Sequence, residues 1–159
     1  MPWIKASLRP AVPLALILLA ACSSSAPPSG GPKADIPDPQ IGIAQLYGPS
    51  DAGFPYGNFE VKYEVQVQNR ADVPLTLRRI TIATSNPEGG AYSLVAPRDY
   101  YFNKIIPAKS GERVEFWARA YGYGRSMRDT EPVTVKGVVN FQSPSGYVNK
   151  VFFQELNQM

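Results

Sequence analysis

The most constraining feature of this sequence is a stretch in which apolar and polar side chains alternate without a break. In residues 59–68 every odd position carries Phe, Tyr or Val, and every even position carries Glu, Lys or Gln. A period of two residues is that of a β-strand with one face buried and the other in water. Because parallel strands are usually covered on both faces, this alternation favours an antiparallel sheet.

Other short stretches with strand character follow at 75–82, 91–95, 112–121, 133–142 and 147–156, with an Ile105-Ile106 pair between them. Turn-forming Pro, Gly, Asn and Ser separate them, and no segment has a clear 3.6-residue period. Seven or eight strands predict an all-β domain over residues 41–159, an antiparallel immunoglobulin-like β-sandwich, with a closed barrel as the alternative. The side chains expected in its core are Val61, Val65, Val114, Phe116, Val135 and Phe141.

Two of these strands contain an irregularity. The apolar positions are odd up to Leu77 and even from Ile80, so the phase changes at Arg78-Arg79. One extra residue in a strand is what a β-bulge supplies, and a short bend between two strands is the alternative. In the stretch at 133–142, Gly137 interrupts the valines, and a glycine within a strand often marks a bulge or the close approach of another backbone.

The first residues of the chain have the composition of a secretion signal. Lys5 and Arg9 precede an apolar run at residues 11–21 that only Pro13 interrupts. As a helix this run would reach about 16 Å, roughly half of a bilayer core. The run is therefore too short for a transmembrane helix and has the length of a signal-peptide apolar region.

The apolar run ends in Leu19-Ala20-Ala21-Cys22, which resembles the lipobox of bacterial lipoproteins. That resemblance implies that residues 1–21 are a signal peptide, and that Cys22 carries a diacylglyceryl group and an acylated amino terminus. Several acyl chains, such as palmitate, anchor a protein stably in a membrane, whereas one holds only marginally. Ser23, in place of the Asp that retains family members at the inner membrane, favours the periplasmic face of the outer membrane in a didermic cell. The alternative is a secreted protein cut near Ala21, with a free cysteine.

Residues 23–40 consist mainly of Pro, Gly, Ser and Ala, and Ile36 is their one large apolar side chain. Such a segment cannot bury enough surface to offset the entropy of ordering it. With the lipidated Cys22 we expect residues 22–40 to form a disordered tether, about 23 Å long as a random coil and about 56 Å long when extended. The alternative is a proline-rich docking motif around Pro37 and Pro39.

The charge gives no reason to expect nucleic-acid binding. The chain has 16 basic and 13 acidic side chains, and two of the basic ones, Lys5 and Arg9, lie in the segment expected to be removed. The remaining chain has fourteen basic and thirteen acidic side chains, a net charge of +1, and its sequence shows no basic stripe of the kind that phosphate contacts require.

The composition also argues against enzymatic chemistry. The chain has no histidine, so histidine-based triads and zinc sites are excluded, and its single cysteine is assigned to the lipid. We expect no cofactor and no metal. The pairs Glu60/Glu64 and Glu112/Glu115 are interpreted as solvated strand residues. A Ser–Lys dyad at Lys109-Ser110 is formally possible, although the sequence around it is that of a turn.

A second resemblance concerns the β-domain. It is carried by the run at residues 63–69, which ends in Asn69, by Pro74-Leu75, and by residues 105–108 ahead of Val114. These segments resemble immunoglobulin-like modules of secreted proteins and lipoproteins, and the water-stress domains related to late-embryogenesis-abundant proteins. The resemblance implies an immunoglobulin-like fold and a non-enzymatic role.

Aromatic residues provide the candidate binding site. Trp, Tyr and Arg dominate binding hot spots, and several of them share the strand face opposite the Phe116 face. We expect a protein partner in the cell envelope, with the domain as an accessory subunit of an envelope assembly. Peptidoglycan or another glycan is the alternative ligand. A third hypothesis is that the domain is a hydrolase without histidine. The tyrosines could also be ordinary strand residues with no binding role. The candidate residues are Trp117, Arg119, Tyr121 and Tyr123, with Tyr100 and Tyr101.

The anchor can be tested by the intact mass of protein extracted from its native membranes. We expect residues 1–21 to be absent and the mass to be raised by acyl chains, and we expect the Cys22→Ala variant to lack that added mass. A free thiol at Cys22 would contradict the lipoprotein hypothesis and leave a secreted domain with a reactive cysteine.

Overall fold

The computed structural model describes residues 36–53, 55–85, 90–96, 98–124 and 130–158, and for Arg98 the backbone alone. The predicted signal peptide, Cys22, Ser23, most of the tether and the turn at 86–89 lie outside these residues. The elements in chain order are the strands β1 (Gln40–Tyr47), β2 (Tyr56–Gln68), β3 (Leu75–Thr84), β4 (Tyr92–Leu94), β5 (Arg98–Ile106), β6 (Gly111–Tyr123), β7 (Val133–Ser143) and β8 (Gly146–Leu156). The described part of the chain has no helix that could cross a membrane.

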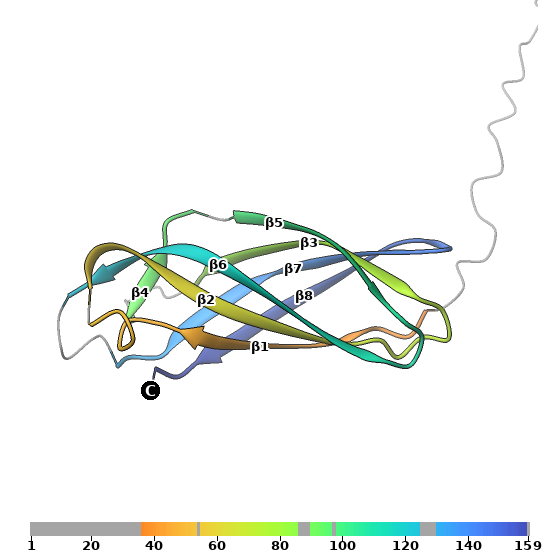
Figure 1. Cartoon of the computed structure of the whole chain (residues 1–159), viewed down its shortest axis with the longest axis horizontal. Coiled ribbons are helices and arrows are strands. Elements are labelled where there is room, and N and C mark those ends of the chain that lie inside the picture. The colour runs from red at the N-terminus through yellow and green to blue at the C-terminus, as the bar shows by residue number, and fades with distance from the viewer. Residues whose placement is uncertain (1–35, 54, 86–89, 97, 125–129, 159) are drawn as a thin grey trace, which may run out of the picture. The chain divides into compact units, whose positions relative to one another are not determined.

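The strands form two antiparallel sheets of four strands each, which pack face to face as a β-sandwich (Figure 1). We call the sheet with order β1-β2-β6-β4 sheet A and the sheet with order β5-β3-β7-β8 sheet B. The β-sandwich prediction is thereby confirmed, with two separate sheets in place of the alternative closed barrel.

The arrangement follows the immunoglobulin-like plan with one exchange. Strands β1, β2 and β6 take the places of A, B and E, and β3, β7 and β8 those of C, F and G. The short β4 lies beside β6, where strand D belongs, and β5 lies beside β3, where strand C′ belongs. The chain therefore visits these two edge positions in the reverse of the usual order.

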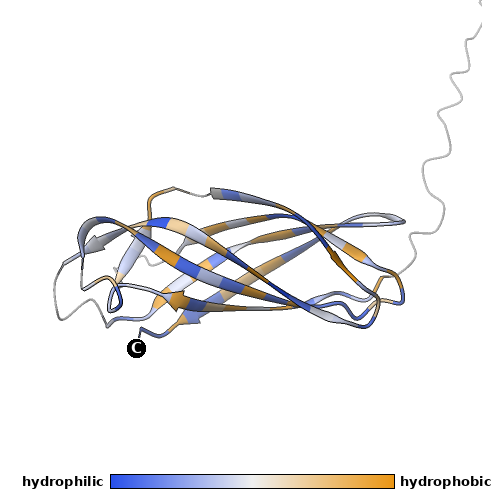
Figure 2. Ribbon diagram, viewed as in Figure 1, coloured by the Kyte–Doolittle hydropathy of each residue, from blue (hydrophilic) through white to orange (hydrophobic). Residues whose placement is uncertain are grey.

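The core lies between the sheets, where the apolar positions of each strand point inward. Apolar and polar residues alternate along the ribbons, which is plain on β2 and β6 (Figure 2). Five of the six expected core side chains are buried and Val114 is half-buried against them. The buried five are Val61, Val65, Phe116, Val135 and Phe141.

The predicted irregularities are also found. The register of β3 shifts between Leu77 and Arg79 against both of its neighbours, which confirms the bulge. Gly137 lies where a Cβ atom would come within 1.9 Å of the carbonyl oxygen of Thr81. A side chain at this position would force β7 away from β3, so glycine is required by the close approach of a backbone.

The domain begins a few residues earlier than expected. Ile36 packs against the core, and Asp38 forms an ion pair with Lys150 at 2.6 Å, so this end of the expected tether is held against the sandwich. Along the same side, the backbone amide of Ile43 donates to Gln154 Oε1 (3.1 Å), and Gln154 Nε2 donates to the Ile43 carbonyl (2.7 Å). A side chain of β8 thus occupies hydrogen-bonding groups at the free edge of β1.

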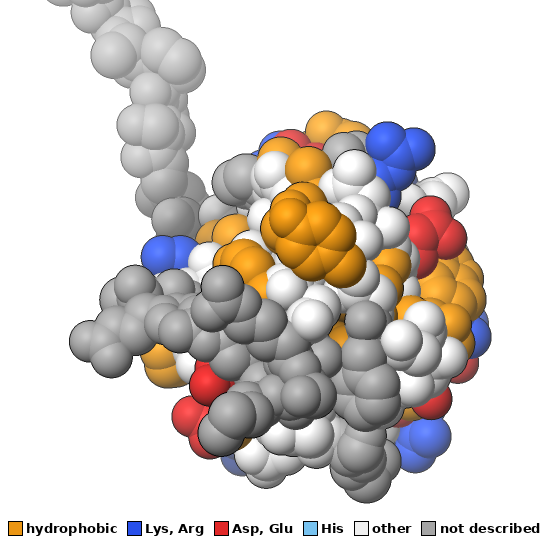
Figure 3. All heavy atoms as spheres, turned by 90° about the vertical axis from the view of Figure 1, so that its left-hand side faces the viewer, with side chains coloured by type: hydrophobic (Ala, Val, Ile, Leu, Met, Phe, Trp, Pro, Cys, Tyr) orange, Lys and Arg blue, Asp and Glu red, His pale blue; other side chains and the backbone are white. Residues whose placement is uncertain are grey.

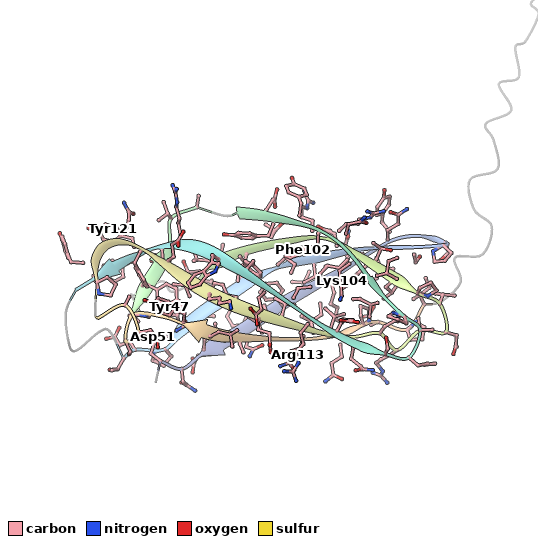
Figure 4. All side chains as sticks on the ribbon, in the orientation of Figure 1. Tyr47, Asp51, Phe102, Lys104, Arg113 and Tyr121 are labelled. Carbon is pink, nitrogen blue, oxygen red and sulfur yellow. The ribbon has the colours of Figure 1, made fainter. Side chains whose placement is uncertain are left out.

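The first half of β5 was not expected as a strand. Its inward positions carry aromatic side chains in place of aliphatic ones. Tyr100 and Phe102 lie against Phe116, with their ring centroids 4.3 and 6.2 Å from that of Phe116. Phe102 lies beneath β5, inside the sandwich (Figure 4). Aromatic residues at alternate positions satisfy the strand period as well as valines do.

One buried side chain ties together the two connections that cross between the sheets at one end. Asn69, fully buried at the end of β2, donates through Nδ2 to the carbonyls of Val73 (2.9 Å), Ile106 (3.2 Å) and Pro107 (2.9 Å). Its Oδ1 accepts from the amide of Ala71 at 3.0 Å. The β2–β3 and β5–β6 connections, which carry the segments of the second resemblance, therefore meet at one amide group.

Replacing Asn69 by Ala should lower the free energy of unfolding by about 3 kcal/mol, because buried carbonyls and an amide lose their partners. Urea denaturation measures the change. The matched control is Asn58→Ala, at an exposed position of the same strand, for which we expect a change below about 0.5 kcal/mol. Equal effects of the two variants would contradict the role given to Asn69.

A second polar group lies inside the sandwich. The hydroxyls of Tyr63 and Tyr92, both fully buried, are 2.7 Å apart, and Tyr92 also donates to Gln45 Oε1. Gln45 in turn donates to Gln158 Oε1 at 2.6 Å. Burial, the largest cause, raises the pKa of both tyrosines above the ordinary value, because a phenolate would lose its hydration.

The raised pKa values predict a loss of stability at alkaline pH. A pKa that is higher in the folded than in the unfolded chain stabilises the fold below the unfolded value, and this contribution is lost as pH rises above about 10. Denaturation curves between pH 8 and 11 should show that decline, and the Tyr63→Phe/Tyr92→Phe variant should show less of it. A Tyr101→Phe variant, which removes an exposed hydroxyl, is the control.

Candidate functional site

The pairing of β2 with β6 gathers aromatic side chains on the outer face of sheet A. The register places Lys62 opposite Trp117, Asn58 opposite Tyr121, and Tyr56 opposite Tyr123. Tyr47 of β1 lies opposite Lys62 on the other side of β2, after a register shift that follows Gln45. We call the resulting set the aromatic row: Tyr47, Tyr56, Trp117, Tyr121 and Tyr123.

The rings of the row contact one another edge to face in two groups, one of Tyr47 and Trp117 and the other of Tyr56, Tyr121 and Tyr123. Trp117 and Tyr47 have ring centroids 5.5 Å apart, Tyr121 and Tyr56 6.1 Å, and Tyr121 and Tyr123 6.0 Å. The row is still open to solvent, because Tyr56 is 80% exposed, Trp117 47% and Tyr121 37%. Tyr121 lies on the outside of the sandwich at the end that faces the viewer in Figure 3, where apolar side chains gather among polar surface (Figures 3 and 4).

Charged side chains accompany the row along β2 and β6. Lys62 forms an ion pair with Glu115 at 2.5 Å, and its Nζ lies 5.8 Å from the centre of the Trp117 ring. Arg119 is exposed and stands opposite Glu60 in the register. The row therefore combines Trp, Tyr and Arg, and Trp117 already has a cation beside its ring.

A hydrogen bond holds the row at its β4 end. The hydroxyl of Tyr123 lies 2.7 Å from Ser93 Oγ. A hydrogen bond with Tyr56 is the first cause that raises the pKa of Tyr121, followed by electrostatic repulsion from Tyr56. Tyrosine hydroxyls are neutral at physiological pH, so the row presents phenol groups that donate and accept hydrogen bonds.

Two glycines allow the end of β6 to lie close to the loop that precedes β2. A Cβ atom on Gly122 would come within 2.3 Å of the Pro55 carbonyl oxygen, and Gly124 has a φ of +62°. Glycine at both positions lets the end of β6 pack against the segment that leads into Tyr56.

The six candidate residues do not form one site. Trp117, Arg119, Tyr121 and Tyr123 share the outer face of sheet A, as expected. Tyr100 is half-buried, with its ring 4.3 Å from that of Phe116, and belongs to the core region. Tyr101, 74% exposed, projects from the outer face of sheet B. Successive residues of a strand point to opposite faces, so neighbours in sequence are separated here.

Two members of the row, Tyr47 and Tyr56, were not among the candidates. Tyr56 continues the outward even positions of the alternating stretch at 59–68, so extending that pattern by three residues would have found it. Tyr47 has no such signal, because the register shift after Gln45 changes the phase of β1.

The other candidate chemical groups have partners of their own. Lys109 pairs with Asp72 at 3.0 Å and donates to the Arg70 carbonyl, whereas Ser110 Oγ donates to the Pro107 carbonyl. Their side chains are thus engaged separately within turns. Three of the four glutamates form ion pairs: Glu64 with Arg113, Glu112 with Lys104 and Glu115 with Lys62. Within the described residues no acidic or cysteine cluster could hold a metal ion.

Comparisons with known proteins support the fold alone. No family model and no curated protein matches the chain. An X-ray structure of a Northeast Structural Genomics Consortium target has 12% sequence identity and a TM-score of 0.51, over 76% of this chain and 86% of that one. A Bordetella pertussis protein described as ApaA has 13% identity and a TM-score of 0.51, over 76% and 94% of the two chains. Both share the β-sandwich architecture, and at this identity nothing further is carried over.

Proposed function

We propose that this chain is a lipid-anchored protein of the cell envelope whose β-sandwich binds a protein partner through the aromatic row and performs no catalysis. The observation that carries the proposal is the grouping of exposed Tyr56, Trp117 and Tyr121 on one sheet face. Exposed apolar patches on monomeric domains often mark binding sites, and Trp and Tyr are enriched among the residues that dominate binding energy.

The geometry of the row favours a protein surface over a glycan. The outer face of a sheet is broad, and the rings stand edge to face, with Trp117 and Tyr47 inclined at 63°. A stacked sugar would need a ring face laid open with polar groups around it. A protein surface can use both ring edges and phenol hydroxyls, and rings already held by their neighbours lose little freedom on binding.

The envelope location rests on the sequence. A lipidated Cys22 would fix the amino terminus at a membrane, and the tether would let the domain reach a partner a few tens of ångströms away. Ser23 favours the periplasmic face of the outer membrane. The separate engagement of Lys109 and Ser110 supports a binding role over a catalytic one.

The partner can be sought by photocrosslinking in cells that produce the full chain. A photoreactive phenylalanine analogue placed at Tyr56, Trp117 or Tyr121 should capture the same protein. The matched control is Val151, 71% exposed on β8 of the opposite sheet, where the analogue should not capture it. The Trp117→Ala/Tyr121→Ala variant should lose most of the captured complex at Tyr56, because hot-spot residues dominate affinity.

Two outcomes would contradict the proposal. Equal capture at Val151 and Trp117 would show that the outer face of sheet A is not the site. Unchanged capture at Tyr56 after the double alanine substitution would show that the aromatic row contributes no binding energy. Thermal unfolding of the double variant checks that the fold is intact, since both side chains are exposed and their removal should cost little stability.

A further inference from the structure

The opposite face of the sandwich contains a hollow unrelated to the aromatic row. It lies on the outer side of sheet B and has a volume of about 350 Å³. This is within the range of small-ligand sites. The residues that line it come from β3, β5, β7 and β8, namely Arg78, Arg79, Tyr101, Asn140, Tyr147 and Asn149.

The bulge in β3 brings two arginines to this hollow. In a regular strand, Arg78 and Arg79 would point to opposite faces, and one guanidinium would be directed at the core. The register shift between Leu77 and Arg79 removes that alternation. Both side chains therefore lie on the outer face, where Arg78 reaches Gln142 and Arg79 reaches Asn140.

Neutral amide oxygens orient the two guanidinium groups. Arg78 donates from Nε (2.9 Å) and Nη2 (2.7 Å) to Gln142 Oε1 and from Nη1 to Asn103 Oδ1, while Arg79 donates from Nε to Asn140 Oδ1 (2.9 Å). These contacts fix the geometry of the groups without cancelling their charge.

Carboxylates near the arginines compensate only part of that charge. Arg79 Nη1 lies 3.5 Å from Asp99, whose other oxygen accepts a hydrogen bond from Thr81. Among the described residues, no carboxylate forms an ion pair with Arg78. The hollow therefore has a positive character, and carboxylates and phosphates are the ligands that guanidinium groups recognise best.

The other walls of the hollow suit a sugar ring. Tyr101 and Tyr147 are 74% and 77% exposed, so ring surface is accessible at the hollow. Asn149 Oδ1 accepts from Asn140 Nδ2 at 2.6 Å, and within the described residues the NH₂ group of Asn149 has no acceptor. An amide donor beside two aromatic rings is suited to the hydroxyl or acetamido oxygens of a sugar.

We propose that this hollow binds an acidic sugar, with its carboxylate or phosphate on Arg78 and Arg79, its ring against Tyr101 and Tyr147, and an oxygen on Asn149. The site lies on sheet B and the aromatic row on sheet A, so both can be occupied at once. The proposal does not depend on the protein partner.

Three related sugars test the proposal on the full chain purified from membranes in detergent. N-acetylmuramic acid carries a carboxylate, N-acetylglucosamine 6-phosphate carries a phosphate, and N-acetylglucosamine carries neither. Calorimetry and the NMR signals of the Arg78 and Arg79 side chains should report saturable binding of one or both acidic sugars. Whichever binds more tightly identifies the anionic group, and N-acetylglucosamine should bind at least about tenfold more weakly.

Matched variants locate the site. Arg78→Gln/Arg79→Gln should weaken binding of the acidic sugar by about tenfold or more, whereas Arg113→Gln, on the opposite sheet, should not change it. Tyr147→Ala should weaken binding by several-fold, and Phe153→Ala, at an exposed position of the same strand outside the hollow, should not, which keeps the test valid if the double arginine variant fails to fold. Absence of saturable binding of both acidic sugars at about 10 mM, equal binding of N-acetylglucosamine, or equal effects of Tyr147→Ala and Phe153→Ala would overturn the proposal.

Discussion

The sandwich depends on the amide group of Asn69, because this one side chain holds both connections that pass between the sheets at that end. The two hydrogens of its NH₂ group are shared among three carbonyls on either side of the crossing, and the Ser110 carbonyl accepts from its backbone amide at 2.8 Å. Only a short side chain with a donor and an acceptor can serve two loops at once. With the crossings fixed, β2 and β6 keep the register that builds the aromatic row.

Much of the fold could be predicted from the sequence, because a half-buried strand carries its own signal of period two. The alternation at 59–68 located β2, the phase change at Arg78-Arg79 located the bulge, and Gly137 marked a close backbone approach. The pattern failed where aromatic residues occupied inward positions, as at Tyr100, which was assigned to a binding surface and packs against Phe116.

The grouping of side chains into sites was harder to foresee, because it depends on strand order and register. Nothing local to Tyr47 indicates that β1 will bring it against Trp117, and the hollow on sheet B draws on four strands, with lining residues that range from Arg78 to Asn149. The two faces also differ in how their side chains are fixed. On sheet A the rings support one another, while on sheet B uncharged amides orient the arginines and leave their charge in place.

The pair of hydrogen bonds between Gln154 and the backbone of Ile43 bears on the solubility of the domain. An exposed strand edge invites pairing with the strand of another molecule. At Ile43 both backbone groups are already occupied by a side chain of the same molecule. Gln154 thus forms the hydrogen bonds at Ile43 that a neighbouring strand would form. It interrupts the row of unpaired backbone N–H and C=O groups on which an intermolecular sheet would depend.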